Sequence, residues 1–332
     1  MFTVADARRY AVSLFAQSPL FKACPRSALA LDADVLLQHF LAKPRAWLFA
    51  HSGADISAIR TAFCAAVERR CTGLPIAYIT GEKEFWGLPF YVTPAVLIPK
   101  PDTELLVEWS LAVIREKAAG RPEKELYLLD PCTGSGCVAV SILHTLYAEH
   151  IRNVRCLAAD ISPASLAVAR INAERLLPPE AQAQLLFLEK DMRALSELTG
   201  QLRKIGFFSS PCASDGMSCR PKNGHSESCG FDLIAANPPY VPSALTQELL
   251  TDGRNEPALA LDGGADGLDF IRILTNNAGN VLNGQGVLLS EVGEYHAKTA
   301  LRLFEQAGFQ NVRMHRDLAG QDRLIEGEKC TR

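Results

Sequence analysis

The sequence predicts an α/β protein, with a doubly wound and mainly parallel β-sheet that follows a small N-terminal helical bundle. After residue 124, short apolar runs alternate with longer segments whose apolar residues recur every three or four positions. This alternation is typical of a parallel sheet covered by helices on both faces. Residues 1–73 show the helical spacing alone. At about 150 residues per domain, a chain of 332 residues has room for both parts.

Residues 1–73 are predicted to form a helical domain. Within them, residues 31–42 and 55–70 carry apolar side chains at three- and four-residue spacing, and Pro44 and Gly53 interrupt the pattern. We therefore expect a bundle of short helices.

Residues 74–100 are predicted to be a β-hairpin linker. Residues 76–81 and 83–94 are rich in β-branched and aromatic side chains, and they lie on either side of a Gly-Glu pair. We expect these two segments to pair as strands.

Residues 101–329 are predicted to contain the sheet. Their first helix has Asp102 or Thr103 as its expected N-cap, and a later helix has Ser162 as N-cap with Pro163 at its first position. The predicted strands are residues 125–130, 154–160, 183–191, 231–240, 286–292, 309–317 and 322–328, and the predicted helices after the first are residues 137–150, 162–176, 267–282 and 295–308.

Residues 205–230 interrupt the alternation of strands and helices. They are rich in Ser, Gly, Pro and Cys and show no periodicity, so we expect a disordered insertion. Cys212, Cys219, His225 and Cys229 are candidate zinc ligands, but they lack the closely spaced cysteine pair that organises most zinc sites. We expect no metal, and we expect the cysteines of the chain to be reduced thiols.

The composition excludes some classes of function. The net charge of −3 gives no support for a dedicated duplex-DNA binder, whose affinity comes largely from basic residues that neutralise phosphates. No stretch approaches the roughly 18 consecutive apolar residues of a membrane span. The first residues lack the basic-then-apolar order of a signal peptide. We therefore expect a cytoplasmic protein that makes no membrane contact.

Three successive strand ends carry residues that suit a nucleoside-bearing cofactor. The first strand ends at Asp130, and the Gly-x-Gly turn at residues 134–136 lets the backbone come close to a ligand, although a tight structural turn would use the same glycines. The second strand ends at Asp160, which can accept hydrogen bonds from both ribose hydroxyls or can cap the next helix. Asp191 and Met192 follow the third strand, where they can bracket an adenine ring.

The fourth predicted strand stops at Asn237, Pro238, Pro239 and Tyr240. Proline has no N–H for a sheet ladder, and each proline restricts the residue before it. The result is a stiff turn that holds the Asn237 side-chain oxygen and the Pro238 carbonyl in fixed directions. Two such acceptors suit one planar NH2 group, whose flat face Tyr240 can cover.

The Asn-Pro-Pro-Tyr motif resembles the signature of S-adenosylmethionine-dependent methyltransferases that act on planar amino or amide nitrogens. Residues 73–108 and 253–271 resemble two further blocks, found in the release factor glutamine methyltransferases (the PrmC/HemK family). The resemblance runs across nearly the whole chain except residues 205–230. It implies a seven-stranded Rossmann-like sheet, S-adenosylmethionine as cofactor, and methylation of the glutamine side-chain amide in the Gly-Gly-Gln motif of peptide-chain release factors.

The resemblance also implies which residues form the site. The implied cofactor-binding residues are Cys132, Thr133, Gly134, Ser135, Gly136, Asp160, Met192 and Asn237, and the implied substrate-binding residues are Asn237, Pro238, Pro239 and Tyr240, of which Asn237, Pro238 and Tyr240 are the catalytic ones. Two positions depart from the family pattern: Cys132 stands where a glycine is usual, and Lys100 stands where an arginine is usual. The helical domain is the expected docking site for the release factor, and we expect a monomer.

Two other functions are open from the motif alone. A nucleic-acid adenine or cytosine aminomethyltransferase acts on a chemically similar exocyclic amine, but a base-flipping enzyme needs a basic cleft and usually a target-recognition domain. A binding module that keeps the fold without catalysis is the other. The resemblance of residues 73–108 favours glutamine, with no direct contact to nucleic acid.

Overall fold

The computed structural model describes residues 1–208 and 230–330. The four candidate zinc ligands lie outside the described residues. Among those residues, no group of three or more His, Cys, Asp and Glu side chains could hold a metal ion, and no helix is both long and apolar enough to cross a membrane. The chain divides into two compact units: a helical unit of Met1–Lys83, Val92–Pro94 and Gln247–Glu256, and a sheet unit of Glu84–Tyr91, Ala95–Thr246 and Pro257–Arg332.

The helical unit packs short helices around one apolar core, in which Phe15, Leu36 and Phe63 are fully buried. Its first helix begins with a capping box, because the Thr3 hydroxyl accepts from the Asp6 N–H at 3.1 Å and the Asp6 carboxylate accepts from the Thr3 N–H in return. The helices are α1 (Val4–Gln17), α2 (Arg26–Leu41), α3 (Arg45–Ala50), α4 (Arg60–Cys71) and α5 (Ile76–Thr80), with 3-10 turns η1 (Pro19–Phe21) and η2 (Ser57–Ile59).

The β-hairpin lies later in the linker than predicted. Strands β1 (Glu82–Phe85) and β2 (Leu88–Tyr91) form a two-stranded sheet of their own. The strand predicted at residues 76–81 is wrong, since Ile76–Thr80 is helix α5. Pro75 stands immediately before its first turn, where a missing N–H leaves no helical hydrogen bond unmade. Position relative to proline thus outweighed the β-branched composition of this segment.

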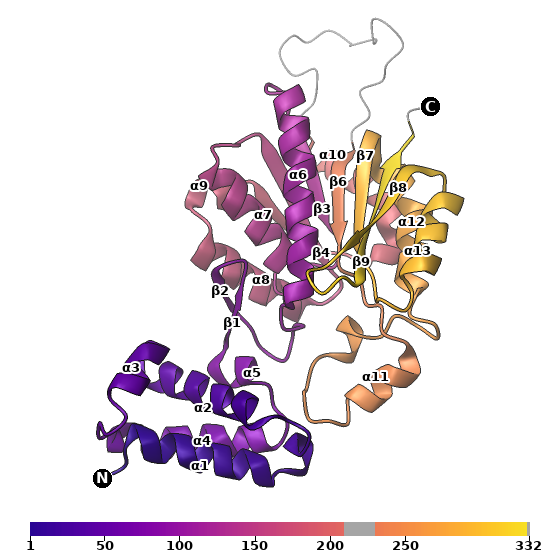
Figure 1. Ribbon diagram of the computed structural model, residues 1–332. Helices are drawn as coiled ribbons and strands as arrows, with labels where there is room; N and C mark the ends of the chain where they lie inside the picture. The colour runs from indigo at the N-terminus through magenta and orange to yellow at the C-terminus, as the bar shows by residue number, and fades with distance from the viewer. Residues whose placement is uncertain (209–229, 331–332) are drawn as a thin grey trace, which may run out of the picture. The chain divides into compact units, whose positions relative to one another are not determined.

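The main sheet of the sheet unit has seven strands in the order β5-β4-β3-β6-β7-β9-β8, which confirms the doubly wound, mainly parallel prediction (Figure 1). The strands are β3 (Leu126–Asp130), β4 (Val154–Asp160), β5 (Leu185–Glu189), β6 (Phe231–Ala236), β7 (Leu282–Glu291), β8 (Phe309–Arg316) and β9 (Asp322–Lys329). The first five run parallel, while β9 is antiparallel to both of its neighbours. The order reverses between β3 and β6, and ligands bind at such a point in open α/β sheets.

Helices cover both faces of the sheet, and each face has its own apolar core. Alternate strand residues point to opposite sides, so Leu128 packs with α6, α7 and α8 while its neighbour Leu129 packs with α10, α12 and α13. Phe207 and Phe208, at the start of the predicted insertion, are buried in the second core. The helices that follow α5 along the chain, whether or not they cover the sheet, are α6 (Glu104–Gly120), α7 (Cys137–Ala148), α8 (Pro163–Leu176), α9 (Pro179–Gln182), α10 (Leu198–Lys204), α11 (Ser243–Leu249), α12 (Asp269–Val281) and α13 (Ala297–Gln306), with 3-10 turns η3 (Pro101–Thr103), η4 (Met192–Glu197) and η5 (Ala258–Ala260).

Candidate active site

The turn after β3 is shaped for close approach by a ligand. Gly134 and Gly136 both have positive φ, of 53° and 80°. A Cβ at Gly136 would lie 3.2 Å from the Ala169 Cβ on α8, so glycine there permits close helix packing. A Cβ at Gly134 would meet no atom within 4 Å and would project into open space instead. Cys132 is not among the residues with positive φ, so its replacement of the family glycine introduces no left-handed strain.

Asp160, at the end of β4, faces this turn. Its Oδ2 accepts from the Gly134 N–H and its Oδ1 accepts from the Ser162 N–H, both at 2.9 Å. Burial raises the pKa of Asp160, and these backbone hydrogen bonds lower it by less. The hydroxyl of Ser162 caps α8, as predicted, by accepting from the Ser165 N–H. Asp160 is therefore held in place by backbone donors, and its half-buried side chain borders the cavity.

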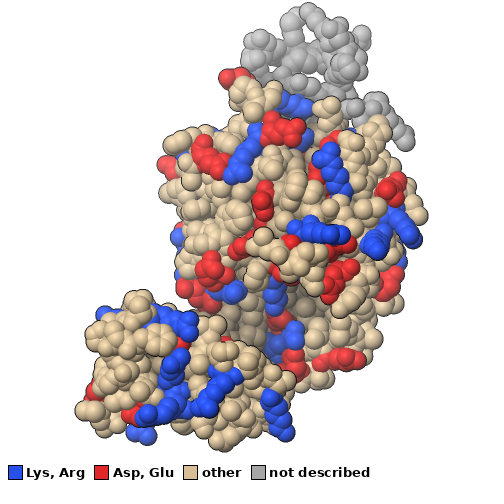
Figure 2. Space-filling view, viewed as in Figure 1, with Lys and Arg blue, Asp and Glu red and all other residues tan. Residues whose placement is uncertain are grey.

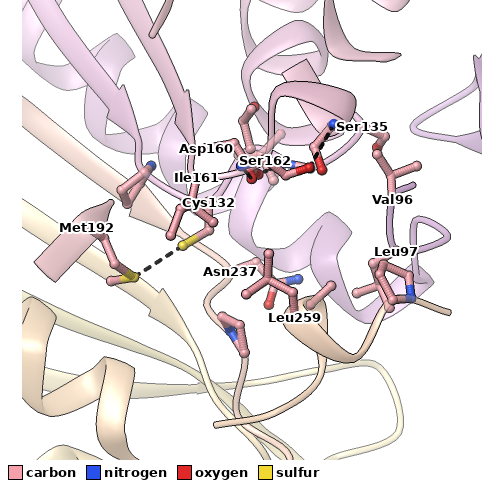
Figure 3. A pocket seen from close by; sticks show the side chains of 18 of the residues that line it. Val96, Leu97, Cys132, Ser135, Asp160, Ile161, Ser162, Met192, Asn237 and Leu259 are labelled. Atoms are coloured by element: carbon pink, nitrogen blue, oxygen red, sulfur yellow. Dashed lines mark hydrogen bonds between the residues drawn. The ribbon is translucent and has the colours of Figure 1, made fainter. Parts of the chain in front are cut away.

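Sulfur atoms line the side of the site next to β5. The Cys132 thiol lies 3.3 Å from the Met192 Sδ (Figure 3). The Asp191 carboxylate accepts from the Arg193 N–H at 2.8 Å. This hydrogen bond caps η4, which begins at Met192. The result is an apolar wall bordered by a carboxylate, and this combination suits the face and edge of an adenine ring.

These residues surround one cavity of the sheet unit. Asp160, Cys132, Met192 and Asn237 all border it (Figure 3). Phe270 and residues from six segments line it, and these segments are 95–103, 131–138, 160–165, 190–193, 237–239 and 257–260. Of the cofactor residues implied by the resemblance, only Gly136 is not in the wall, since it packs against α8. Sequence reasoning did not anticipate the contributions of residues 95–99 and 257–260, because they have no strand-end position to mark them.

Asn237 lies at the wall of this cavity, where the two prolines end β6. Its Nδ2 donates to the Thr103 Oγ1 at 3.0 Å. That is its one side-chain hydrogen bond among the described residues, so the Asn237 Oδ1 is unused, and the Pro238 carbonyl likewise accepts none there. The sequence predicted Thr103 as a possible N-cap of α6. Its hydroxyl makes no capping hydrogen bond and accepts from the Asn237 Nδ2 instead.

The remaining residues of the motif are placed differently. Pro239 borders the cavity, whereas Pro238 is buried and neither it nor Tyr240 forms part of the wall. The Tyr240 hydroxyl donates to Glu291 Oε1 at 2.9 Å. Glu291 ends β7, and burial raises its pKa to about 7. It was missed in the sequence, although its position at a strand end is the signal that identified Asp160.

The described residues suit a nucleoside-bearing cofactor. The open space beside Gly134 and the half-buried Asp160 form a polar cradle, and the Cys132–Met192 wall is apolar. The Asn237 Oδ1 is an unused acceptor at the same wall, and the carbonyl of the adjoining Pro238 is a second acceptor with no hydrogen bond among the described residues. With the sheet order, these features define a Rossmann-like enzyme of the methyltransferase class.

Comparison with known proteins identifies the family. A model of the PrmC N-terminal domain matches residues 7–81. The release factor glutamine methyltransferase of Moorella thermoacetica is 35% identical over 297 residues, covering 89% of each chain, and that of Bordetella pertussis is 36% identical over 299 residues, covering 90% of this chain and 94% of the other. The crystal structure of a release-factor-specific protein-(glutamine-N5) methyltransferase from Alicyclobacillus acidocaldarius matches with a TM-score of 0.39 and 27% identity, over 73% of this chain and 100% of that one. The chain belongs to the release factor glutamine methyltransferase family.

Proposed function

We propose that this protein methylates the side-chain amide nitrogen of the glutamine in the Gly-Gly-Gln motif of peptide-chain release factors, with S-adenosylmethionine as the methyl donor. The observation that carries the proposal is the Asn237 turn, in which the unused Asn237 Oδ1 lies at the wall of the cofactor-type cavity and the carbonyl of the adjoining Pro238 is a second unused acceptor among the described residues. Two acceptors suit the two N–H bonds of one primary amide. Membership in the family supports the choice of glutamine over other amides.

The residues around the cavity fit this cofactor. Asp160 would accept from the ribose hydroxyls, Met192 and Cys132 would contact the adenine, and the open backbone at Gly134 would admit the rest of the molecule. When bound, S-adenosylmethionine supplies an already activated methyl group on a sulfonium. The work left to the protein is to orient the amide and exclude water.

Orientation is the larger part of the chemistry. An amide nitrogen is a poor nucleophile because its lone pair is delocalised into the carbonyl. The Asn237 Oδ1 and the Pro238 carbonyl would each accept one N–H, holding the nitrogen in line and stabilising the positive charge that develops on it. Both acceptors are fixed before substrate arrives, because prolines restrict the turn and Thr103 holds the Asn237 side chain.

The decisive experiment is the mass and position of the methyl group on a treated release factor. The purified protein is incubated with isotopically labelled S-adenosylmethionine and, separately, with a release factor, duplex DNA and tRNA. We expect a single methyl group on the Gly-Gly-Gln glutamine. Label on nucleic acid alone would overturn the proposal in favour of base methylation. Over the sheet unit in Figure 2, acidic and basic side chains lie side by side, so this face of the sheet unit gives base methylation no support.

We also propose that the helical unit docks the release factor, because the glutamine must be delivered by a large protein. Deleting residues 1–73 should then lower kcat/KM for an intact factor at least tenfold more than for a short Gly-Gly-Gln peptide. Residues 247–256 belong to the same compact unit and would lose their packing partners, so cofactor affinity is measured alongside as a control for folding. Equal losses on the two substrates would argue against a docking role.

A further inference from the structure

We propose that Glu291 and Thr103 are positioning residues that fix which end of the Asn237 amide faces the substrate. They would do so through a relay of hydrogen bonds that runs from Glu291 to Thr103 to Asn237. The inference rests on the proposed function, since it concerns the orientation of the proposed amide-binding side chain. Neither residue has to touch substrate or cofactor for the relay to act.

The outer step of the relay is the contact between Thr103 and Asn237. Thr103 is 2% exposed, at the end of η3, and its Oγ1 lies 3.0 Å from the Asn237 Nδ2. A threonine hydroxyl carries one hydrogen, and the Thr103 side chain lies close enough to the Glu291 carboxylate to lower its pKa, although no hydrogen bond of good geometry joins the two. If that hydrogen is directed to Glu291, Thr103 has only lone pairs left for Asn237. Asn237 must then turn its NH2 toward Thr103 and its oxygen toward the cavity.

The relay begins at the Glu291 carboxylate. Glu291 is 1% exposed at the end of β7, and the Tyr240 hydroxyl donates to its Oε1 at 2.9 Å. Its Oε2 is buried and makes no hydrogen bond of good geometry with the described residues, so the carboxylate has spare accepting capacity next to Thr103. An ionised carboxylate only accepts, and it therefore draws the hydroxyl hydrogens of Thr103 and Tyr240 toward itself.

Protonation of Glu291 would reverse the relay. A neutral carboxyl group can donate to Thr103, whose hydroxyl hydrogen is then free to point at Asn237. The Asn237 oxygen would satisfy that donor, and its NH2 would turn toward the cavity. A substrate amide would then meet a donor where it needs an acceptor, so only the ionised form supports binding in the reactive orientation.

Several charged or titratable groups surround Glu291. Burial raises the pKa of Glu291, the nearby Thr103 side chain and the hydrogen bond from Tyr240 lower it, the Arg323 guanidinium on β9 also lowers it, and Asp102 raises it. Cys137 on α7 interacts with Glu291 electrostatically. Burial is the largest influence, and the resulting pKa is about 7. Glu291 is therefore protonated below about pH 7 and ionised above it, so turnover should fall as the pH drops through this value.

His296 is a further titratable side chain near the motif. A Cβ at Gly293 would lie 3.4 Å from the Tyr240 ring and 3.5 Å from the His296 ring, so His296 lies next to Tyr240. Histidines change charge near neutral pH and could produce a similar pH profile. The His296→Gln variant is therefore the control that separates the two groups.

The test compares Thr103→Val, Thr103→Ser and Glu291→Gln in the full chain, with a release factor as substrate. Thr103→Val keeps the shape of threonine without its hydroxyl, and we expect kcat to fall about 10- to 100-fold with little change in cofactor affinity. Thr103→Ser restores the hydroxyl and should stay within about threefold of wild type. Glu291→Gln should lower kcat similarly and abolish the acidic limb of the pH profile, which His296→Gln should retain.

A readout without substrate keeps this test independent of the proposed function. In protein labelled with 15N-asparagine, the Asn237 side-chain NH2 signals, assigned by their loss in Asn237→Ala, should shift with a midpoint near pH 7. The shift should vanish in Glu291→Gln and Thr103→Val. Wild-type turnover in Thr103→Val, or an unchanged titration of the Asn237 signals in Glu291→Gln, would overturn the relay. If wild type fails to methylate a release factor, the proposed function fails and the NH2 titration still decides the relay.

Discussion

Replacing Asn237 with alanine should lower methyl transfer to a release factor by a few hundredfold or more, while the protein stays folded. The substitution removes the acceptor that Thr103 holds at the cavity wall, and the loss of one preorganised polar contact to a transition state costs on the order of 100- to 1,000-fold in kcat. It removes no buried apolar group, because Asn237 is half-exposed, so a large loss of stability is not expected. Single-turnover methylation at saturating cofactor measures the effect on chemistry directly.

The matched control is Asn277→Ala. Asn277 lies on α12 of the same unit, and its Nδ2 donates to the Ile273 carbonyl of its own helix, away from the cavity. We expect nearly normal turnover from this variant. If Asn237→Ala and Asn277→Ala both turn over at the wild-type rate with their folds intact, Asn237 is not the amide-binding residue.

Much of the sheet unit could be predicted because its buried parallel strands are short apolar runs with helical segments between them. The local sequence pattern did not predict the secondary structure, or the unit to which a segment belongs, where a single residue or a distant segment determines it. Ile76–Thr80 has a strand-like composition, yet it is a helix that starts directly after Pro75. Residues 247–256 join the helical unit although about 170 residues separate them from its last helix, α5. No periodicity in the sequence marks such a long-range assignment.

The site residues that could be predicted from the sequence are those at the ends of predicted strands. Asp160 and Asn237 each end or follow a strand, and the structure brings both to one cavity. Thr103 could not be assigned from sequence, because a threonine before a helix is typical of an N-cap and only the tertiary structure shows its hydroxyl on Asn237. That contact brings part of the block at residues 73–108 to the Asn-Pro-Pro-Tyr turn itself. Glu291 ends its strand as Asp160 does, so the same rule would have found it.

Replacing Asp160 with alanine should weaken binding of S-adenosylmethionine roughly 100-fold or more, the second large effect that we expect. Hydrogen bonds to a charged group contribute about 1.5–3 kcal/mol each, and a ribose offers two hydroxyls to this carboxylate. Isothermal titration calorimetry with S-adenosylhomocysteine measures the loss without turnover. Turnover at very high cofactor concentration should recover in part, because Asp160 does not contact the amide-binding turn in the structure.

The fold should survive this substitution. The pKa of Asp160 is raised in the folded protein, so burial disfavours the charged form more than its hydrogen bonds favour it, and above that pKa the ionised group lowers stability. Water can replace the lost oxygens at the Gly134 and Ser162 N–H groups, since Asp160 borders the cavity. Asp160→Asn is not a neutral alternative, because both carboxylate oxygens accept from backbone N–H groups and an asparagine NH2 would face one of those donors.

Glu149→Ala is the control for loss of a carboxylate from the same unit. Glu149 pairs with Arg115 on the surface, and exposed pairs of this kind contribute little to stability. We expect unchanged cofactor affinity from Glu149→Ala. Affinity within about threefold of wild type in Asp160→Ala would show instead that Asp160 acts only as a structural anchor for the Gly134 turn and the start of α8, and the cavity would need another ribose acceptor.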